Sequence, residues 1–233
     1  MKQMMTGPSW RLLTPVARRC LALAVVLAAL TGCTAARGLR PEPVAVVAPA
    51  PAEIRGAVVE QLADGRAGFT IRENPSMDAE SRRDFERATG LITSQDYGKA
   101  IELLEKVVER SPGVTAPYIN LAIAYQHAGK PAPAEQSLKR ALELVPGHPV
   151  ASNEYGLLLR KAGRFAEARG IYEQALAAFP DYYPVRRNLG ILCDLYLRDQ
   201  ACALAHYELY SAAKPGDEQV KIWIADLRIR IKP

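Results

Sequence analysis

Three histidines and four cysteines are the residues of this 233-residue chain best suited to metal binding or nucleophilic catalysis. The histidines, His127, His148 and His206, lie far apart, and none has a His, Cys or carboxylate partner at a metal-ligand spacing such as His-Glu-x-x-His. The sequence also contains no glycine-rich phosphate loop and no nucleophile elbow. We therefore expect a protein that is not an enzyme, with no metal site and no cofactor.

Two of the cysteines, Cys193 and Cys202, stand nine residues apart on either side of a predicted bend between two helices. In a helical hairpin both would lie within about two turns of the bend, so their side chains could face each other. Two interpretations stay open from sequence: a disulfide, which requires Cα atoms within about 7 Å, or two small buried apolar residues.

The elements that position these residues follow from an internal repeat. Four prolines recur at spacings of 34, 34 and 35 residues, an alanine stands twelve residues before each, and a bulky apolar residue stands eight before each. A further small residue lies about twelve positions earlier still. The four sets are Ala88, Ala100, Leu104 and Pro112; Ala122, Ala134, Leu138 and Pro146; Gly156, Ala168, Tyr172 and Pro180; and Gly190, Ala203, Tyr207 and Pro215.

This period of 34 residues, with small and large positions in register, resembles the tetratricopeptide repeat (TPR) family from Ser81 to about Gly216. The stretch from Ala151 to Pro180 is the clearest unit, with two amphipathic helices joined at Ala162-Gly163-Arg164. One such hairpin cannot bury its apolar face alone, so the repeats must stack. The resemblance implies an all-α solenoid of about four helical hairpins.

We expect helix pairs near 78–93 and 97–110, 115–128 and 131–144, 149–162 and 165–178, and 182–197 and 200–213. The fourth pair carries one extra residue between Gly190 and Ala203, and it has Arg198-Asp199 where the second and third pairs have glycine. A last amphipathic helix should cap the stack, although the alternation in LRIRIK also allows a strand.

The N-terminus has the pattern of an export signal. Basic residues and no acidic ones precede an uninterrupted apolar run from Leu21 to Leu30, which is too short to span a bilayer. The sequence Leu30-Thr31-Gly32-Cys33 resembles a bacterial lipobox, in which Cys33 becomes the lipidated first residue. The alternative is a plain secretory signal with a chance cysteine.

That resemblance implies a lipid-anchored protein that faces the periplasm. Residue 34 is threonine. In the enterobacterial lipoprotein family an aspartate at this position resembles a signal for retention in the inner membrane, so its absence leads us to expect that the protein is anchored in the outer membrane. Loss of residues 1–32 removes four basic residues and leaves 26 basic against 25 acidic ones. This near-neutral balance disfavours a nucleic-acid partner.

The expected organisation has five parts. The segment 54–77 contains two short apolar runs around Asp64-Gly65, a turn signal, and either packs on the first repeat or stays mobile. The parts are a lipoprotein signal peptide (1–32), a Pro/Ala-rich flexible tether (33–53), a short hairpin-like or irregular segment (54–77), the TPR array (78–216) and a C-terminal capping helix (217–233).

TPR stacks present the first helix of each pair along a concave groove, which implies a partner-binding surface here. It should be mainly apolar with three polar anchors, Asn153, Arg160 and Arg187, and should suit an extended or helical protein segment. The chaperone-type clamp for terminal carboxylates is not expected, because only Asn120 fits among its matching positions. The groove positions are Phe85, Thr89, Ile119, Ile123, Gln126, Asn153, Leu157, Arg160, Arg187, Ile191 and Asp194.

The function that these features favour is a non-enzymatic, lipid-anchored periplasmic adaptor that holds partner proteins at a membrane. Its plan is similar to that of TPR lipoproteins of type IV and Flp pilus assembly, an analogy of architecture and not of site. The alternatives are a scaffold or regulator of cell-wall or protease enzymes, or a receptor for a peptide or peptidoglycan ligand.

Overall fold

The computed structural model describes residues 57–61, 69–73 and 77–231. Within these residues, one antiparallel strand pair precedes nine α-helices, so the predicted all-α array is confirmed. The predicted signal peptide, Cys33 and the tether lie outside the described residues. The helices are α1 (Ala79–Thr93), α2 (Tyr97–Arg110), α3 (Thr115–His127), α4 (Pro131–Leu144), α5 (Pro149–Lys161), α6 (Phe165–Ala178), α7 (Tyr183–Leu192), α8 (Gln200–Ala213) and α9 (Glu218–Ile231).

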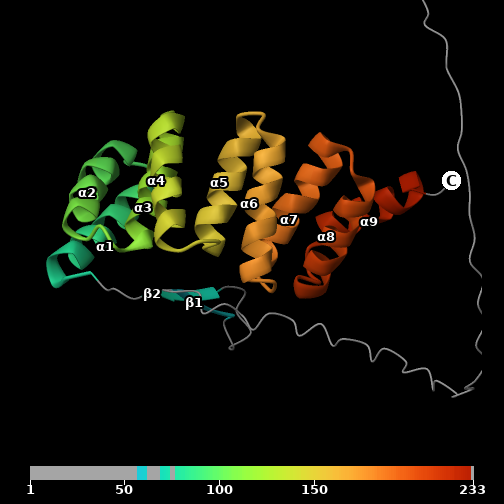
Figure 1. The fold of residues 1–233 in the computed structure, drawn as a ribbon, viewed down its shortest axis with the longest axis horizontal. Helices are drawn as coiled ribbons and strands as arrows, with labels where there is room; N and C mark the ends of the chain where they lie inside the picture. The colour runs from blue at the N-terminus through green and yellow to red at the C-terminus, as the bar shows by residue number, and fades with distance from the viewer. Residues whose placement is uncertain (1–56, 62–68, 74–76, 232–233) are drawn as a thin grey trace, which may run out of the picture. The chain divides into compact units, whose positions relative to one another are not determined.

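The helices stack as antiparallel pairs in chain order (Figure 1). Each second helix packs against the first helix of its own pair and against the first helix of the next pair. The first helices also contact one another, α1 with α3, α3 with α5 and α5 with α7. The first helices therefore form one continuous layer along the stack.

The small and large residues of the repeat meet inside each pair. Ala88, Ala122, Ala134 and Ala168 have no exposed surface, and neither do the large residues Leu104, Leu138 and Tyr172. Small residues let the helix axes approach closely, and the large side chain from the second helix fills the space that remains. The 34-residue pattern is thus the packing pattern of the core.

The bends inside the pairs need a left-handed residue. Gly163 has φ +76° at the end of α5, and a glycine adopts this conformation without a steric cost. The fourth pair uses Arg198 at φ 55° instead. There α7 continues into a π-helical turn, Cys193–Leu197, and the backbone N–H of Asp199 donates to the carbonyl of Cys193. A π turn accommodates one additional residue in a helix, and the extra residue of the fourth repeat is absorbed in this way.

The end of the array is held by a disulfide and by a capping helix. Cys193 is bonded to Cys202 of α8, with 5.9 Å between their Cα atoms. Helix α9 packs on α8 and buries Val220, Ile224 and Leu227, while Asp217 accepts a hydrogen bond from the N–H of Val220 at its start. The strand alternative for the C-terminal tail is wrong, because residues 227–231 continue the helix.

The strand pair lies N-terminal to the array. Strand β1 (Ala57–Gln61) pairs with β2 (Phe69–Glu73) in antiparallel register, with Val59 opposite Ile71. The Phe69 ring lies 4.7 Å from the ring of Tyr182 and 5.1 Å from that of Tyr183, between centroids. A hairpin of this size is marginal alone, and here it rests on the start of α7.

Candidate functional site

The predicted groove residues lie on the first helices of the four pairs, and we call this set the inner row. Its members share an intermediate exposure, so their side chains are neither in the core nor fully in solvent, except that Ile119 is buried. Thr89 has the same intermediate exposure, whereas the Asp194 side chain is only 8% exposed and accepts a hydrogen bond from Arg230 Nη2 at 2.9 Å. The row runs from Phe85 on α1 through Ile119, Ile123 and Gln126 on α3, Asn153, Leu157 and Arg160 on α5, to Arg187 and Ile191 on α7.

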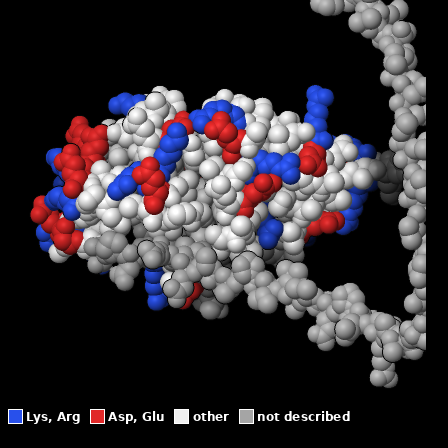
Figure 2. Space-filling model, in the orientation of Figure 1, with Lys and Arg blue, Asp and Glu red and all other residues white. Residues whose placement is uncertain are grey.

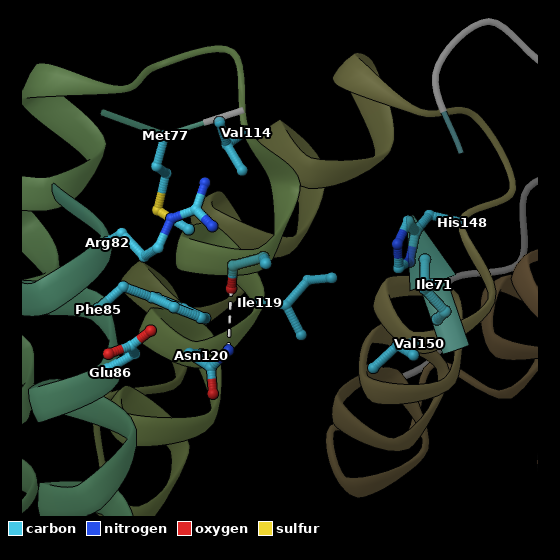
Figure 3. Close-up of a pocket in the computed structure, with 11 residues that line it drawn as sticks. Ile71, Met77, Arg82, Phe85, Glu86, Val114, Ile119, Asn120, His148 and Val150 are labelled. Carbon is cyan, nitrogen blue, oxygen red and sulfur yellow. Dashed lines mark hydrogen bonds between the residues drawn. The ribbon is translucent and has the colours of Figure 1, made fainter. Parts of the chain in front are cut away.

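A cavity of about 520 Å³ brings together the N-terminal members of the row. Phe85 and Ile119 line it with Val114, Val150 and Ile71, the last from β2. Figure 3 shows α1 and α3 on one side of this cavity, and Ile71 beside His148 and Val150 on the other. The Asn120 amide at its edge is already engaged, since its Nδ2 donates to the carbonyl of Ala116 at 3.0 Å. The cavity is chiefly apolar.

The middle of the row is polar and partly buried. Asn188 of α7 donates to the side-chain carbonyl of Asn153 at 2.7 Å, so an amide pair joins the third and fourth first helices. Burial raises the pKa of the neighbouring Glu154 carboxyl, although a hydrogen bond from Asn153 opposes the shift. An extended backbone carries amides and carbonyls that such groups could bind.

Arg160 is the polar residue of the row with the most unused capacity. Its guanidinium carbon lies 5.7 Å from the ring centroid of Tyr196, within the range of a cation–π contact. One of its nitrogens, Nη1, is buried without a hydrogen-bond partner among the described residues. A buried guanidinium donor without an acceptor carries a free-energy cost, which a carboxylate or carbonyl from a ligand would relieve.

A second cavity, of about 810 Å³, lies at the C-terminal end of the row. Ile191 and Asp194 line it together with Tyr207 and with Trp223 of the capping helix. Arg187 stacks over Trp223, 5.2 Å from the ring centroid, and its Nε lies 3.8 Å from Asp217. Arg187 is therefore engaged inside the protein, and Arg160 is the better candidate for a ligand-binding cation.

The row therefore has a chiefly apolar cavity at one end, a polar centre, and at the other end a cavity whose lining is both aromatic and charged. The structure brings Phe85 and Ile119 to one cavity and Ile191 to the other, and it places Asn153 and Arg160 between them. Ile123 and Ile191 also pack against the buried core, which leaves only part of each side chain available.

Three contributors to the site were not identified from the sequence. Asn188 stands 34 residues after Glu154 and 68 after Asn120, so the repeat register places it one position after the row residues Ile119, Asn153 and Arg187. Trp223 lies on the capping helix, outside the register. Ile71 lies outside the repeats altogether, and no periodic signal connects it to Val150.

The described residues hold no group of three or more metal-ligating side chains. Among them, no helix is both long and apolar enough to cross a bilayer. Figure 2 shows basic and acidic side chains interspersed over the visible face, with acidic ones gathered at the end formed by α1 and α2. The visible face carries no broad surface of one sign, which a nucleic-acid interface would need.

The repeat pattern matches known family models. Residues 91–153 match one model described as tetratricopeptide repeat, and residues 149–192 match another with the same description. These matches run from the end of α1 to the end of α7. They identify the helices from α2 to α7 as tetratricopeptide repeats, in agreement with the sequence expectation.

Curated relatives share only part of their length with this chain. It is 26% identical over 135 residues to a probable UDP-N-acetylglucosamine--peptide N-acetylglucosaminyltransferase SPINDLY of Petunia hybrida, a match that covers 58% of this chain and 14% of that protein. It is 28% identical over 99 residues to the small glutamine-rich tetratricopeptide repeat-containing protein 2 of Mycosarcoma maydis, covering 42% and 28%. The chain thus spans less than a third of either relative.

Solved structures share the fold. PilF of Pseudomonas aeruginosa superposes with a TM-score of 0.59 at 22% identity, over 64% of this chain and 68% of that one. MamA of Desulfovibrio magneticus RS-1 gives a TM-score of 0.57 at 17% identity, over 66% and 87%. At these identities the likeness establishes the helical solenoid and nothing finer.

Proposed function

We propose that this chain, which is built of tetratricopeptide repeats, is a non-enzymatic scaffold that binds partner proteins along its inner row. The observation that carries the proposal is the row itself, with a chiefly apolar cavity at one end, a polar centre, and an aromatic and charged cavity at the other end, along four first helices. Such a surface matches a protein segment with apolar side chains and a hydrogen-bonding backbone. TPR domains in general bind proteins, which supports the same conclusion.

The proposal extends to location. The lipobox-like Leu30-Thr31-Gly32-Cys33 supports a lipid anchor at Cys33, and threonine at residue 34 supports the outer membrane with the array in the periplasm. The plan shared with TPR lipoproteins of pilus assembly supports a role in building a pilus or another envelope complex. This last step is an analogy of architecture.

The scaffold function is tested by photo-crosslinking in cells. A photoreactive phenylalanine is placed at Ile123, Leu157 or Ile191 on the row. Matched controls carry it at Arg140 or Glu173 on second helices, where the side chains are 46% and 52% exposed. We expect the row positions to give a shared crosslinked partner and the control positions to give none.

A second variant tests the polar centre. Arg160→Glu should reduce the yield of the shared crosslink from the Leu157 position by about tenfold or more. The substitution replaces an unpaired hydrogen-bond donor with a negative charge, which repels an acceptor of the partner. Arg140→Glu is the matched charge reversal away from the row and should leave the crosslink unchanged. Equal crosslinking from row and control positions would contradict the proposal.

A further inference from the structure

The hairpin β1–β2 presents two different faces. Successive side chains of a strand point to opposite sides, so Phe69 and Ile71 share one face of β2, and Thr70 and Arg72 share the other. Arg72 lies 3.7 Å from Glu60 across the strands, with side chains 73% and 56% exposed, and Val58 is 56% exposed. The polar face therefore points to solvent.

The other face contacts the array at two places. Phe69 packs on Tyr182 and Tyr183, which precede and begin α7. Ile71 lines the N-terminal cavity of the inner row together with Val150 (Figure 3). The hairpin thus contributes one side chain to an aromatic site near the fourth pair and one to an apolar site between the first three.

These contacts are shallow. Phe69 and Ile71 both stay partly exposed, whereas Tyr182 and Tyr183, on which Phe69 packs, are each only 9% exposed. About 520 Å³ of cavity remains beside Ile71. The array supplies well-formed apolar sites, and the hairpin fills them only in part.

From this we infer that β2 acts as an internal ligand of the N-terminal cavity of the inner row and of the adjoining aromatic site at Tyr182 and Tyr183, and that the external partner is an extended segment with an aromatic and a branched aliphatic side chain two residues apart. The partner would displace β2 and place its own side chains against Tyr182 and Val150. This inference rests on the proposed function. It adds the chemical class of the partner and a competitor that the partner must overcome.

The competition between β2 and an external segment can be measured as a change in binding affinity. A tethered segment acts at an effective concentration in the millimolar range, and the apparent affinity of an external ligand falls in proportion to the fraction of molecules whose site is open. Removing the two apolar side chains of β2 should open the site. We expect binding of an external strand to become about tenfold tighter or more.

The probe is a fluorescent peptide with the sequence of residues 66–74, RAGFTIREN, titrated into the full chain in detergent and followed by anisotropy. The test variant is Phe69→Ser with Ile71→Ser, and Ile71→Asp alone is a second, smaller perturbation. Val58→Ser is the matched control, because it removes an apolar side chain from the solvent face of the same hairpin. Far-ultraviolet circular dichroism checks that the helices are intact in each protein.

The peptide should bind the double variant and Ile71→Asp at least tenfold more tightly than it binds the native chain or Val58→Ser. Adding Val150→Asp to the double variant should abolish this binding. A peptide in which Phe and Ile are adjacent should not bind the double variant. Equal affinity for the native chain and the double variant would overturn the inference, as would binding that Val150→Asp does not weaken or no binding to any variant. In those cases crosslinks from Leu157 still test the scaffold function separately.

Discussion

At the scale of single residues, the array is set by matched volumes inside each helix pair. The first two pairs oppose Ala88 to Leu104 and Ala122 to Leu138, whereas the third opposes Gly156 to Tyr172. A Cβ atom at Gly156 would overlap the Tyr172 ring. The fourth pair repeats the arrangement, with Gly190 under the ring of Tyr207. A smaller residue on the first helix thus accompanies a larger one on the second.

This complementarity gives a prediction for Gly156→Ala. The added methyl group overlaps the Tyr172 ring, so we expect the free energy of unfolding to fall by about 1 to 3 kcal/mol. Tyr172→Leu in the same chain restores the Ala–Leu pair of the first two repeats and should recover most of the loss. The Tyr172 hydroxyl is buried without a hydrogen-bond partner among the described residues, so its removal leaves no acceptor unsatisfied. Urea unfolding followed by circular dichroism measures all three proteins.

Gly170→Ala is the control for this prediction. Gly170 lies in α6, and apart from its chain neighbours and its own helix backbone no atom lies within 4 Å of the point that a Cβ would occupy, so alanine should stabilise the helix by about 0.5 to 1 kcal/mol. If Gly156→Ala were as stable as Gly170→Ala, the close contact between Gly156 of α5 and the Tyr172 ring would be contradicted.

At the scale of helices, a carboxylate joins the second repeat to the third. Glu135 of α4 accepts hydrogen bonds from the Tyr155 hydroxyl of α5 at 3.0 Å and from Arg164 Nη1 at 2.8 Å. Lys139 lies 2.8 Å from the same carboxylate. These contacts, with Lys139 and Arg164 foremost, lower the pKa of Glu135 from 4.5 to about 2. The ion pair therefore connects the second helix pair to the third.

The lowered pKa predicts how stability depends on pH. A carboxyl whose pKa is lower in the folded state contributes stability above its unfolded pKa, here near 4.5, and loses it as the pH falls toward about 2. We expect Glu135→Gln to lower the free energy of unfolding by about 1 to 2 kcal/mol at pH 7, after allowance for partly exposed partners. The difference from the native chain should shrink toward zero near pH 2.

Urea titrations at pH 7, 4.5 and 2.5 measure this dependence. Glu167→Gln is the matched control, because Glu167 also pairs with Arg164 but is 57% exposed and belongs to the same repeat; its loss should change stability little. A constant difference between Glu135→Gln and the native chain at all three pH values would show that the charge of Glu135 is not responsible.

At the scale of the whole molecule, repetition decided what the sequence could predict. Eight helix positions followed from one 34-residue register, because each unit buries the same small and large positions. The extra residue of the fourth repeat was visible as a spacing, but the π turn at Cys193–Leu197 that absorbs it depends on local packing. The contact of Phe69 with Tyr182 spans more than one hundred residues and has no periodic signal.

For the candidate site, too, the repeated part could be predicted from the sequence and the unrepeated part could not. The register predicted an inner row from Phe85 to Ile191, because every repeat presents the same helix face. It could not show that Arg187 is taken up by Trp223 of the capping helix, or that Ile71 enters the first cavity. These are contacts between repeated and unrepeated parts of the chain, where only the packed structure determines which side chains meet.

The last prediction concerns how the whole molecule is held at a membrane. The described helices are too short or too polar to span a bilayer, so membrane association in our proposal depends on acyl chains at Cys33, each buried methylene of which contributes about 0.8 kcal/mol. Cys33→Ala should therefore move the protein from the membrane pellet to the soluble fraction, measured by fractionation with a high-salt wash. Cys20→Ala is the matched control and should stay in the pellet, because Cys20 precedes the expected cleavage site. If Cys33→Ala remained in the washed pellet, another part of the chain or a membrane partner would have to hold it there, and the array would not be tethered through residue 33.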